Sequence, residues 1–242
     1  MKNILKLFGI IALTAIIGFT VTACGGNGGG GDGDLPPAGD GSIDFSSPLT
    51  GQVYQGIGIP YSPGTLVDFA YFADWCEDRD SCKEGGTCSG HLTPLSDVFS
   101  GTTTVTVSAS GWLSMKLGTP KDEYLITDNH SGLSGLSVTS GLKFFSINIF
   151  NNSNYNQLCW EKRWEYGHEW EEWIGFIYAN KAGTIRGTRD EGGYVDIHNQ
   201  NLRQGWNTVI LKRKFDFDIG DYTHNTHVTG KPGSDFEWVL EY

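Results

Sequence analysis

The segment of the chain with the most chemical potential runs from Cys159 to Trp173, CWEKRWEYGHEWEEW. It combines one tyrosine, one histidine and five glutamates with four tryptophans, Trp160, Trp164, Trp170 and Trp173. Indole rings stack on the apolar faces of sugars, and neighbouring carboxylates accept hydrogen bonds from hydroxyl groups, so an exposed segment of this kind would form a glycan-binding platform. If the rings instead pack on a sheet, the segment is an amphipathic cover of the core. Both interpretations are open, and catalysis is the least favoured, because glycosidases need two acids about 5–9 Å apart across a cleft.

A second candidate for chemistry is the set of four cysteines that follow residue 75, namely Cys76, Cys82, Cys88 and Cys159. In an exported protein an even number of cysteines predicts two disulfides, and three pairings are open. The first three lie five residues apart in a polar loop around residues 74–91, which has little apolar surface to bury. Structural zinc sites place their cysteines two to four residues apart, so the spacing favours disulfides over a metal site that includes His91.

Acidic residues gather in the same loop, with five carboxylates in 11 residues: Asp74, Glu77, Asp78, Asp80 and Glu84. Clustered oxygen ligands can bind calcium, and the run from Asp216 to Asp221 is a second, similar candidate. Neither run has the spacing of an EF-hand, so a solvated acidic loop is the favoured interpretation. The sequence therefore predicts no cofactor, with calcium as the minor alternative.

The histidines and one glycine-flanked cysteine suggest no catalytic set. His224 and His227 lie three residues apart in a predicted strand, so they should point to opposite faces and not share a metal. Gly86-Thr87-Cys88-Ser89-Gly90 has the letters of a nucleophile elbow, but its flanks predict neither the strand nor the helix which that motif requires. We expect no metal site, no catalytic residues and no enzymatic activity.

The N-terminus carries the most specific motif of the chain. Two lysines precede an apolar run that ends at Val21-Thr22-Ala23-Cys24, the order of parts found in secretory signals. The last four residues resemble the lipobox of bacterial lipoproteins. That resemblance implies cleavage before Cys24, acyl chains on Cys24 and a protein held to the outer membrane or the cell surface, with the periplasmic face as an alternative. Two or more acyl chains anchor a protein stably to a bilayer.

Composition limits what the rest of the chain binds. The chain has 17 basic and 28 acidic residues, a net charge of −11. A domain this acidic repels the phosphates of nucleic acid, so we expect no nucleic-acid binding. It also repels anionic lipids, so acyl chains rather than basic side chains must hold it to a bilayer. The Gly- and Asp-rich run after Cys24 predicts a flexible tether. We therefore expect three parts: a signal peptide at 1–23, a lipidated cysteine and linker at 24–42, and a folded domain at 43–242.

Strand signals dominate that domain. Alternating or β-branched runs are bounded by glycine, proline and asparagine, and 13% of the chain is aromatic. Strands are expected at 52–59, 65–72, 102–108, 112–117, 142–150, 173–179, 184–188, 194–202, 206–212, 222–228 and 236–241. Turns at 180–183, 203–205 and 230–233 predict three sequential hairpins, and only the segment 157–172 is considered for a helix. The fold class is all-β, an antiparallel sandwich or a compact barrel of short strands.

The C-terminal pattern carries a second, looser resemblance. Gly205-Trp206-Asn207-Thr208-Val209, followed by Lys231-Pro232-Gly233 and Glu237-Trp238, resembles the end of many uncharacterised secreted or lipid-anchored bacterial β-proteins. This resemblance supports the fold class alone. The sequence as a whole predicts a membrane-anchored lipoprotein that presents a surface for a glycan or protein ligand. The alternatives are a structural or envelope-assembly lipoprotein and, less favoured, a hydrolase acting on glycosides.

Overall fold

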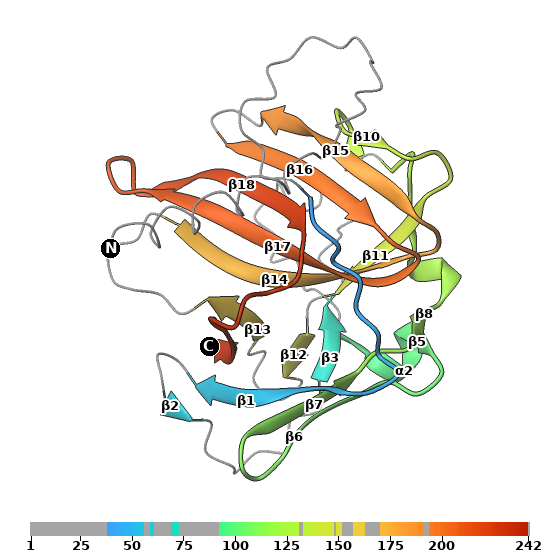
Figure 1. The fold of residues 1–242 in the computed structure, drawn as a ribbon, viewed down its shortest axis with the longest axis vertical. Helices are drawn as coiled ribbons and strands as arrows, with labels where there is room; N and C mark the ends of the chain where they lie inside the picture. The colour runs from blue at the N-terminus through green and yellow to red at the C-terminus, as the bar shows by residue number, and fades with distance from the viewer. Residues whose placement is uncertain are drawn as a thin grey trace, which may run out of the picture. The chain divides into compact units, whose positions relative to one another are not determined.

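The protein is built almost entirely from β-strands, as predicted (Figure 1). The structure is a computed structural model that describes residues 38–55, 59–60, 69–72, 92–130, 133–147, 149–151, 157–162, 170–190 and 194–241. The earlier strands are β1 (Leu49–Gln55), β2 (Ile59–Pro60), β3 (Phe69–Phe72), β4 (Leu92–Pro94), β5 (Phe99–Ser100), β6 (Thr104–Val107), β7 (Trp112–Lys116), β8 (Thr119–Pro120), β9 (Ile126–Thr127) and β10 (Ser137–Val138). The later strands are β11 (Lys143–Ile147), β12 (Ile149–Asn151), β13 (Gln157–Lys162), β14 (Trp170–Ala179), β15 (Gly183–Asp190), β16 (Val195–Leu202), β17 (Gly205–Asp216), β18 (Asp221–Thr229) and β19 (Phe236–Glu241). A one-turn helix α2 (Leu95–Val98) and a 3₁₀ turn η1 (Asp122–Tyr124) interrupt them.

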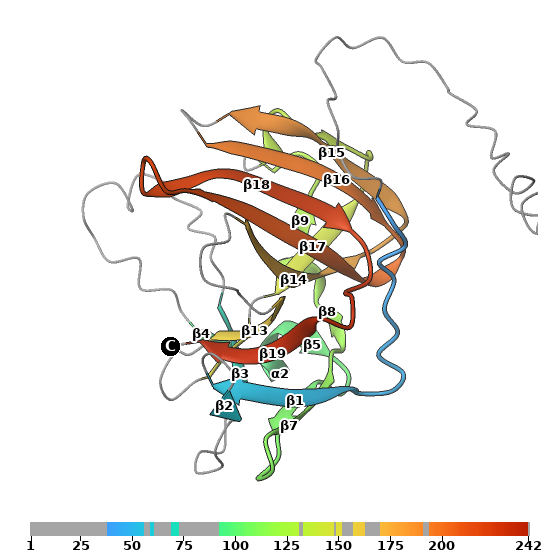
Figure 2. The same ribbon diagram turned by 60° about the vertical axis from the view of Figure 1, so that its left-hand side comes forward.

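The longest strands form one layer, which we call the long-strand layer. Its strands lie in the order β10, β15, β16, β18, β17 and β14, and all neighbours are antiparallel except β16 and β18, which are parallel. Strand β11 pairs with the other edge of β14. The second layer, the closing layer, has the order β13, β19, β1, β7 and β6, with β19 and β1 parallel (Figure 2). Among the described strands the sheet does not close into a barrel, so the sandwich form of the prediction holds with a mixed rather than purely antiparallel sheet.

Apolar side chains on alternate positions of these strands fill two clusters. The larger lies between the layers and joins residues of β1, β7, β14 and β19, among them Val53, Met115, Phe176 and Trp238. The smaller covers the other face of the long-strand layer and includes Ile177, Ile185, Leu202 and Val209 beneath Leu142 and Phe144. The middle of β14 and the first half of β17 therefore lie between the two clusters, and these are the parts of the two strands with the most buried side chains.

The three hairpins that the sequence predicted, around residues 180–183, 203–205 and 230–233, are wrong. The turn at Ser108–Gly111 does join the paired strands β6 and β7. The turns at 180–183, 203–205 and 230–233, however, connect strands that pair with other partners: β15 with β16, β17 with β18, and β19 with β1 and β13. Strand β18 lies between β16 and β17, because a turn fixes where the chain reverses but not which strand lies beside it.

Two further predictions need correction. The segment 157–172 is not a helix in its described residues, since Gln157–Lys162 is β13 and β14 begins at Trp170. The folded domain also begins before residue 43. The Gly39 N–H donates to the Thr229 carbonyl at 2.8 Å, and the Thr208 N–H donates to the Gly41 carbonyl at 2.7 Å. A Cβ at Gly41 would lie 2.3 Å from the Thr208 oxygen, so only glycine allows this approach.

The predicted signal peptide (1–23) and the predicted lipid anchor at Cys24 lie outside the described residues. Within the part of the chain that the structure describes, we find no helix that is both long and apolar enough to span a membrane.

Candidate functional site

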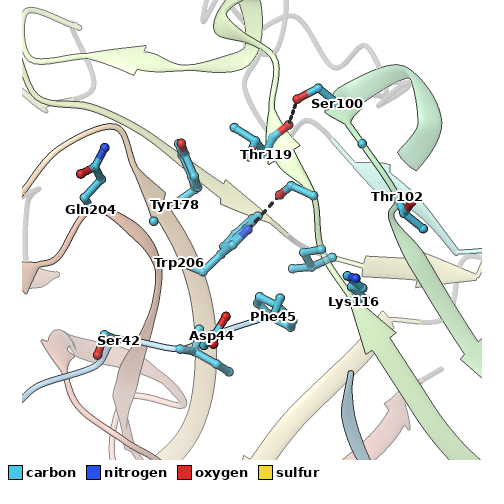
Figure 3. A pocket seen from close by; sticks show the side chains of 15 residues that line it. Ser42, Asp44, Phe45, Ser100, Thr102, Lys116, Thr119, Tyr178, Gln204 and Trp206 are labelled. Atoms are coloured by element: carbon cyan, nitrogen blue, oxygen red, sulfur yellow. Dashed lines mark hydrogen bonds between the residues drawn. The ribbon is translucent and has the colours of Figure 1, made fainter. Parts of the chain in front are cut away.

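A pocket of about 680 Å³ lies where five separate segments meet (Figure 3). Residues 42–45 form one wall, residues 100–102 after β5 and 116–119 around β7 and β8 form the opposite wall, and Tyr178 and residues 204–206 complete it. Cavities of about 300–1,000 Å³ are typical of small-molecule sites. The volume is therefore sufficient for a ligand of one or two sugar rings.

Three aromatic rings form the apolar part of this pocket. Trp206 is buried and donates a hydrogen bond from Nε1 to the Gly118 carbonyl at 2.9 Å. Tyr178 and Phe45 meet the indole edge-on, with ring centroids 5.7 and 6.0 Å away. Phe45 and Trp206 are buried and Tyr178 is half-buried, so Tyr178 is the ring of the three with the most surface left for a ligand.

Polar groups line the rest of the pocket. Figure 3 shows Gln204 beside Tyr178, with Ser100, Thr102 and Lys116 across from them and Asp44 on the third side. Ser46 donates hydrogen bonds from its hydroxyl and its backbone to Asp44, at 2.7 and 2.8 Å, and these lower the pKa of Asp44 below its usual value. Asp44 is thus an ionised acceptor at neutral pH. Of the lining residues it is the one carboxylate, so this lining lacks the pair of acids that glycoside hydrolysis requires.

The turn before β17 places Gln204 and Trp206. Asn207 is fully buried, accepts a hydrogen bond from the Arg203 N–H at 2.8 Å and donates from Nδ2 to the carbonyls of Arg203 and Gly205 at 2.9 and 3.0 Å. Gly205 has a φ of +94°, a conformation that residues with a Cβ rarely adopt. One amide therefore closes this turn and sets the position of the pocket residues on it.

The tryptophans predicted as a glycan platform do not share one face. Trp160 on β13 is half-buried, packs against the core and stacks on Trp238 at 4.8 Å, as the core-cover interpretation requires. Trp170 and Trp173 lie three residues apart on β14 and so point to opposite faces. Trp164 lies outside the described residues.

Of the two tryptophans on β14, Trp170 is 45% exposed, with the Lys214 ammonium 6.0 Å from its ring centroid. Trp173 is half-buried, and the Arg213 guanidinium covers its ring at 5.0 Å. Arg213 also forms an ion pair with Glu171 at 2.7 Å. The guanidinium thus covers one face of the Trp173 ring, where a sugar would otherwise stack.

The cysteine and calcium predictions fall largely outside the described residues. Cys159 is buried on β13, while Cys76, Cys82 and Cys88 and the acidic residues 74–84 lie in a range that is not described. The second calcium candidate, Asp216–Asp221, forms the turn between β17 and β18. There the Asp216 carboxylate accepts hydrogen bonds from the backbone N–H groups of Asp218 and Ile219, as in an ordinary Asx turn.

A buried polar cluster that the sequence analysis missed lies on β15, β16 and β18. The parallel register places His198 beside His227 and Asp196 beside Asn225, all on one face. The Asp196 carboxylate lies 2.9 Å from His198 Nε2, 3.0 Å from His227 Nε2 and 2.5 Å from Arg189 Nη2. His224 lies beside Val195, on the opposite face from His227, in agreement with the prediction from spacing.

Burial and hydrogen bonding set the charges in this cluster. Burial alone would raise the pKa of Asp196, but hydrogen bonds from His198, His227 and Arg189 outweigh it and hold that pKa well below its usual range. Burial lowers the pKa of His198, against the hydrogen bond to Asp196, which raises it. Asp196 is therefore ionised and His198 neutral at pH 7.

The alternation Asp196, His198, Gln200 within a predicted strand was the one signal in the sequence for this cluster. It marks a polar face of β16, but the partner His227 depends on a pairing between strands that are not consecutive. No family model, no curated protein and no solved structure matches this chain.

Proposed function

We propose that the protein is a membrane-anchored lipoprotein whose β domain binds a polar, polyhydroxylated ligand of the glycan class in the pocket around Tyr178. The single observation that carries this proposal is the lining: an aromatic ring beside an amide, hydroxyl groups, one carboxylate and one ammonium group. Sugars present both apolar C–H faces and many hydroxyls, so they need this combination. A pocket for an apolar ligand would lack the polar groups, and one for an anion would lack Asp44.

The pocket also suits a tethered protein. Its first wall, residues 42–45, follows directly on the predicted linker, and this wall is fixed to β17 by the hydrogen bond from the Ile43 N–H to the Trp206 carbonyl at 3.0 Å. With acyl chains on Cys24, residues 25–38 would form the tether, and a Gly-rich chain of this length has a root-mean-square reach of roughly 20 Å from the bilayer. A receptor for glycans at the cell envelope is consistent with that distance.

The binding experiment uses the full chain, purified in detergent. A glycan array identifies a ligand, and isothermal titration then compares wild type with Gln204→Ala and Tyr178→Ala. Gln204 is exposed, so its removal leaves the fold intact. We expect each variant to weaken binding about tenfold, the equivalent of about 1.4 kcal/mol.

Trp170→Ala is the matched control, because it removes an exposed aromatic ring outside the pocket. Unchanged affinity in this control supports the pocket. If Trp170→Ala abolishes binding while both pocket variants bind normally, the aromatic-acidic segment is the site and the pocket proposal is wrong.

The anchor is tested separately. Metabolic labelling with an alkyne fatty acid should mark the wild-type protein and not Cys24→Ser, because the thiol carries the lipid. Label retained in Cys24→Ser, or an unmodified Cys24 in mass spectra of the mature protein, would contradict the lipoprotein proposal and leave the pocket proposal untouched.

One feature favours the alternative of an envelope-assembly protein. Phe217 and Ile219, in the turn between β17 and β18, are 58% and 66% exposed. Exposed apolar side chains at a hairpin tip are typical of protein contacts. In-cell crosslinking from position 217 should capture one defined envelope protein if this alternative holds, and no crosslinked partner would count against it.

A further inference from the structure

We infer that Asp196, His198 and His227 form a binding site for a divalent transition-metal ion of the zinc class. One ligand atom from each of these residues lies within 4.8 Å of the others. Two imidazoles and one carboxylate are a common ligand set for zinc and for ferrous iron. This site is separate from the pocket and does not depend on the proposed function.

The strand pairing places the three side chains. Asp196 and His198 are two residues apart on β16 and so share a face, and the parallel neighbour β18 brings His227 directly beside His198. The two imidazole rings stack, with centroids 4.2 Å apart and planes 5° from parallel. Ligand atoms around a tetrahedral zinc ion lie about 3.3 Å apart, so binding requires the rings to tilt toward a common point by side-chain rotation.

The charges suit a cation. The buried Asp196 carboxylate lies 2.9 Å from His198 Nε2 and 3.0 Å from His227 Nε2, so one acidic oxygen donor and two imidazole nitrogen donors are grouped together, as in zinc sites. Arg189 Nη2 and His198 Nε2 both lie at Asp196 Oδ2, 2.5 and 2.9 Å away, while Asp196 Oδ1 is buried and lies 3.0 Å from His227 Nε2. The carboxylate can therefore keep Arg189 on one oxygen and offer the other to the ion.

Two buried amide oxygens give independent support. Gln200 Oε1 and Asn225 Oδ1 have no hydrogen-bond partner. The Gln200 amide lies 3.0 Å from His198 Nδ1. When His198 Nε2 binds a metal, Nδ1 carries the proton and needs an acceptor, and a half-turn of the Gln200 amide supplies Oε1. Such an outer partner fixes the tautomer of a metal-ligating histidine.

Asn225 completes the arrangement. Its amide nitrogen lies 2.8 Å from His227 Nε2, the atom that would ligate the ion. A half-turn of this amide would present Oδ1 to the metal as a further oxygen ligand. The two unpartnered oxygens and the two ligating histidines are thus neighbours, as expected of a site built for an ion.

The test measures binding of Zn²⁺ alone to the full chain, purified in detergent and stripped with a chelator. Titration calorimetry and elemental analysis should show one equivalent that disappears in both His198→Ala and His227→Ala. His224→Ala is the matched control, since it removes a histidine of the same strand that points to the opposite face. Co²⁺ substitution should give a visible absorption spectrum that is lost in the same two variants.

Gln200→Leu keeps all three ligands and should weaken Zn²⁺ binding about 10- to 100-fold. If the histidine variants fail to fold, wild-type protein decides the question: Zn²⁺ should protect His198 and His227, but not His224, from acylation by diethylpyrocarbonate. Absence of bound Zn²⁺ in wild type, an equivalent that survives in both folded histidine variants, or lack of protection would each overturn the inference. Zinc that still binds both folded histidine variants, or that leaves His198 and His227 open to acylation, would be bound by other residues.

Discussion

At the scale of single residues, the buried amide of Asn207 has the largest structural role that the sequence did not indicate. It lies at the start of β17, with its side chain fully buried. Its oxygen accepts one backbone hydrogen bond and its nitrogen donates to two carbonyls of the turn before β17. A buried group that satisfies several backbone partners is costly to replace, because each partner then loses its hydrogen bond without access to water.

We predict that Asn207→Asp lowers the free energy of unfolding by about 3 kcal/mol or more. The side chain keeps its size, but two carbonyls lose a donor and face a buried charge. Urea unfolding followed by tryptophan fluorescence measures the change. The control is Asn201→Asp, because Asn201 uses its oxygen to accept from Arg186 Nη2 and a carboxylate preserves that contact. Equal stability of the two variants would contradict the role of Asn207.

At the scale of elements, Gly51 on β1 leaves room for a large side chain of the neighbouring strand β19. Trp238 of β19 lies against Gly51, and a Cβ on Gly51 would come within 2.4 Å of Trp238 Cδ1. The same indole stacks on Trp160 at 4.8 Å and on Phe176 at 6.2 Å. The indole of Trp238 thus packs against two aromatic rings as well as Gly51, and it is 4% exposed, so it has little room to move away from an added Cβ.

Gly51→Ala should destabilise the protein by about 1–3 kcal/mol, the range for adding a carbon to a filled core. Guanidinium unfolding gives the stability, and near-ultraviolet circular dichroism reports the displaced tryptophan stack. Gly39→Ala serves for comparison, since a Cβ there meets the Thr229 oxygen at an ordinary 3.5 Å. If both variants are as stable as wild type, the contact with Trp238 is looser than the structure indicates.

The sequence predicted the ranges of individual strands better than the pairing of strands that are far apart in the chain. Strands β6 and β7 match the predicted ranges 102–108 and 112–117 closely, because the alternation of apolar and polar residues acts over a few positions. The segment Gln157–Lys162 was misjudged, since its glutamates and tryptophans suit an amphipathic helix as well as a strand. Pairing of β13 with β19 over six residues decided it.

At the scale of the whole molecule, the last described strand, β19, pairs with the first, β1, in the closing layer. Strand β19 lies between β1 and β13, parallel to one and antiparallel to the other (Figure 2). It buries Trp238, Val239 and Leu240 almost completely. At about 1.5–3 kcal/mol for each large apolar side chain, these three contribute an amount comparable to the whole stability of an ordinary domain, about 5–15 kcal/mol.

A chain that ends at Gly233 should therefore fail to fold. We expect it to lack the cooperative thermal transition and near-ultraviolet signal of wild type and to be degraded rapidly by low concentrations of protease. The chain without residues 1–23 should keep the wild-type transition, because all described strands lie within Pro36–Tyr242. A cooperative transition in the shortened chain would show that β19 is dispensable.

The sequence by itself determined the all-β class and the positions of most strands, and it carries the four residues that resemble a lipobox, because each of these features depends on residues that are neighbours in the chain. The tertiary structure alone decided which strands pair. Backbone hydrogen bonds are the same for every strand, so the parallel partners β16 and β18 were selected by the fit of their side chains over long distances in sequence. The pocket around Tyr178 and the cluster of Asp196, His198 and His227 both follow from such pairings, and for that reason no local pattern revealed them.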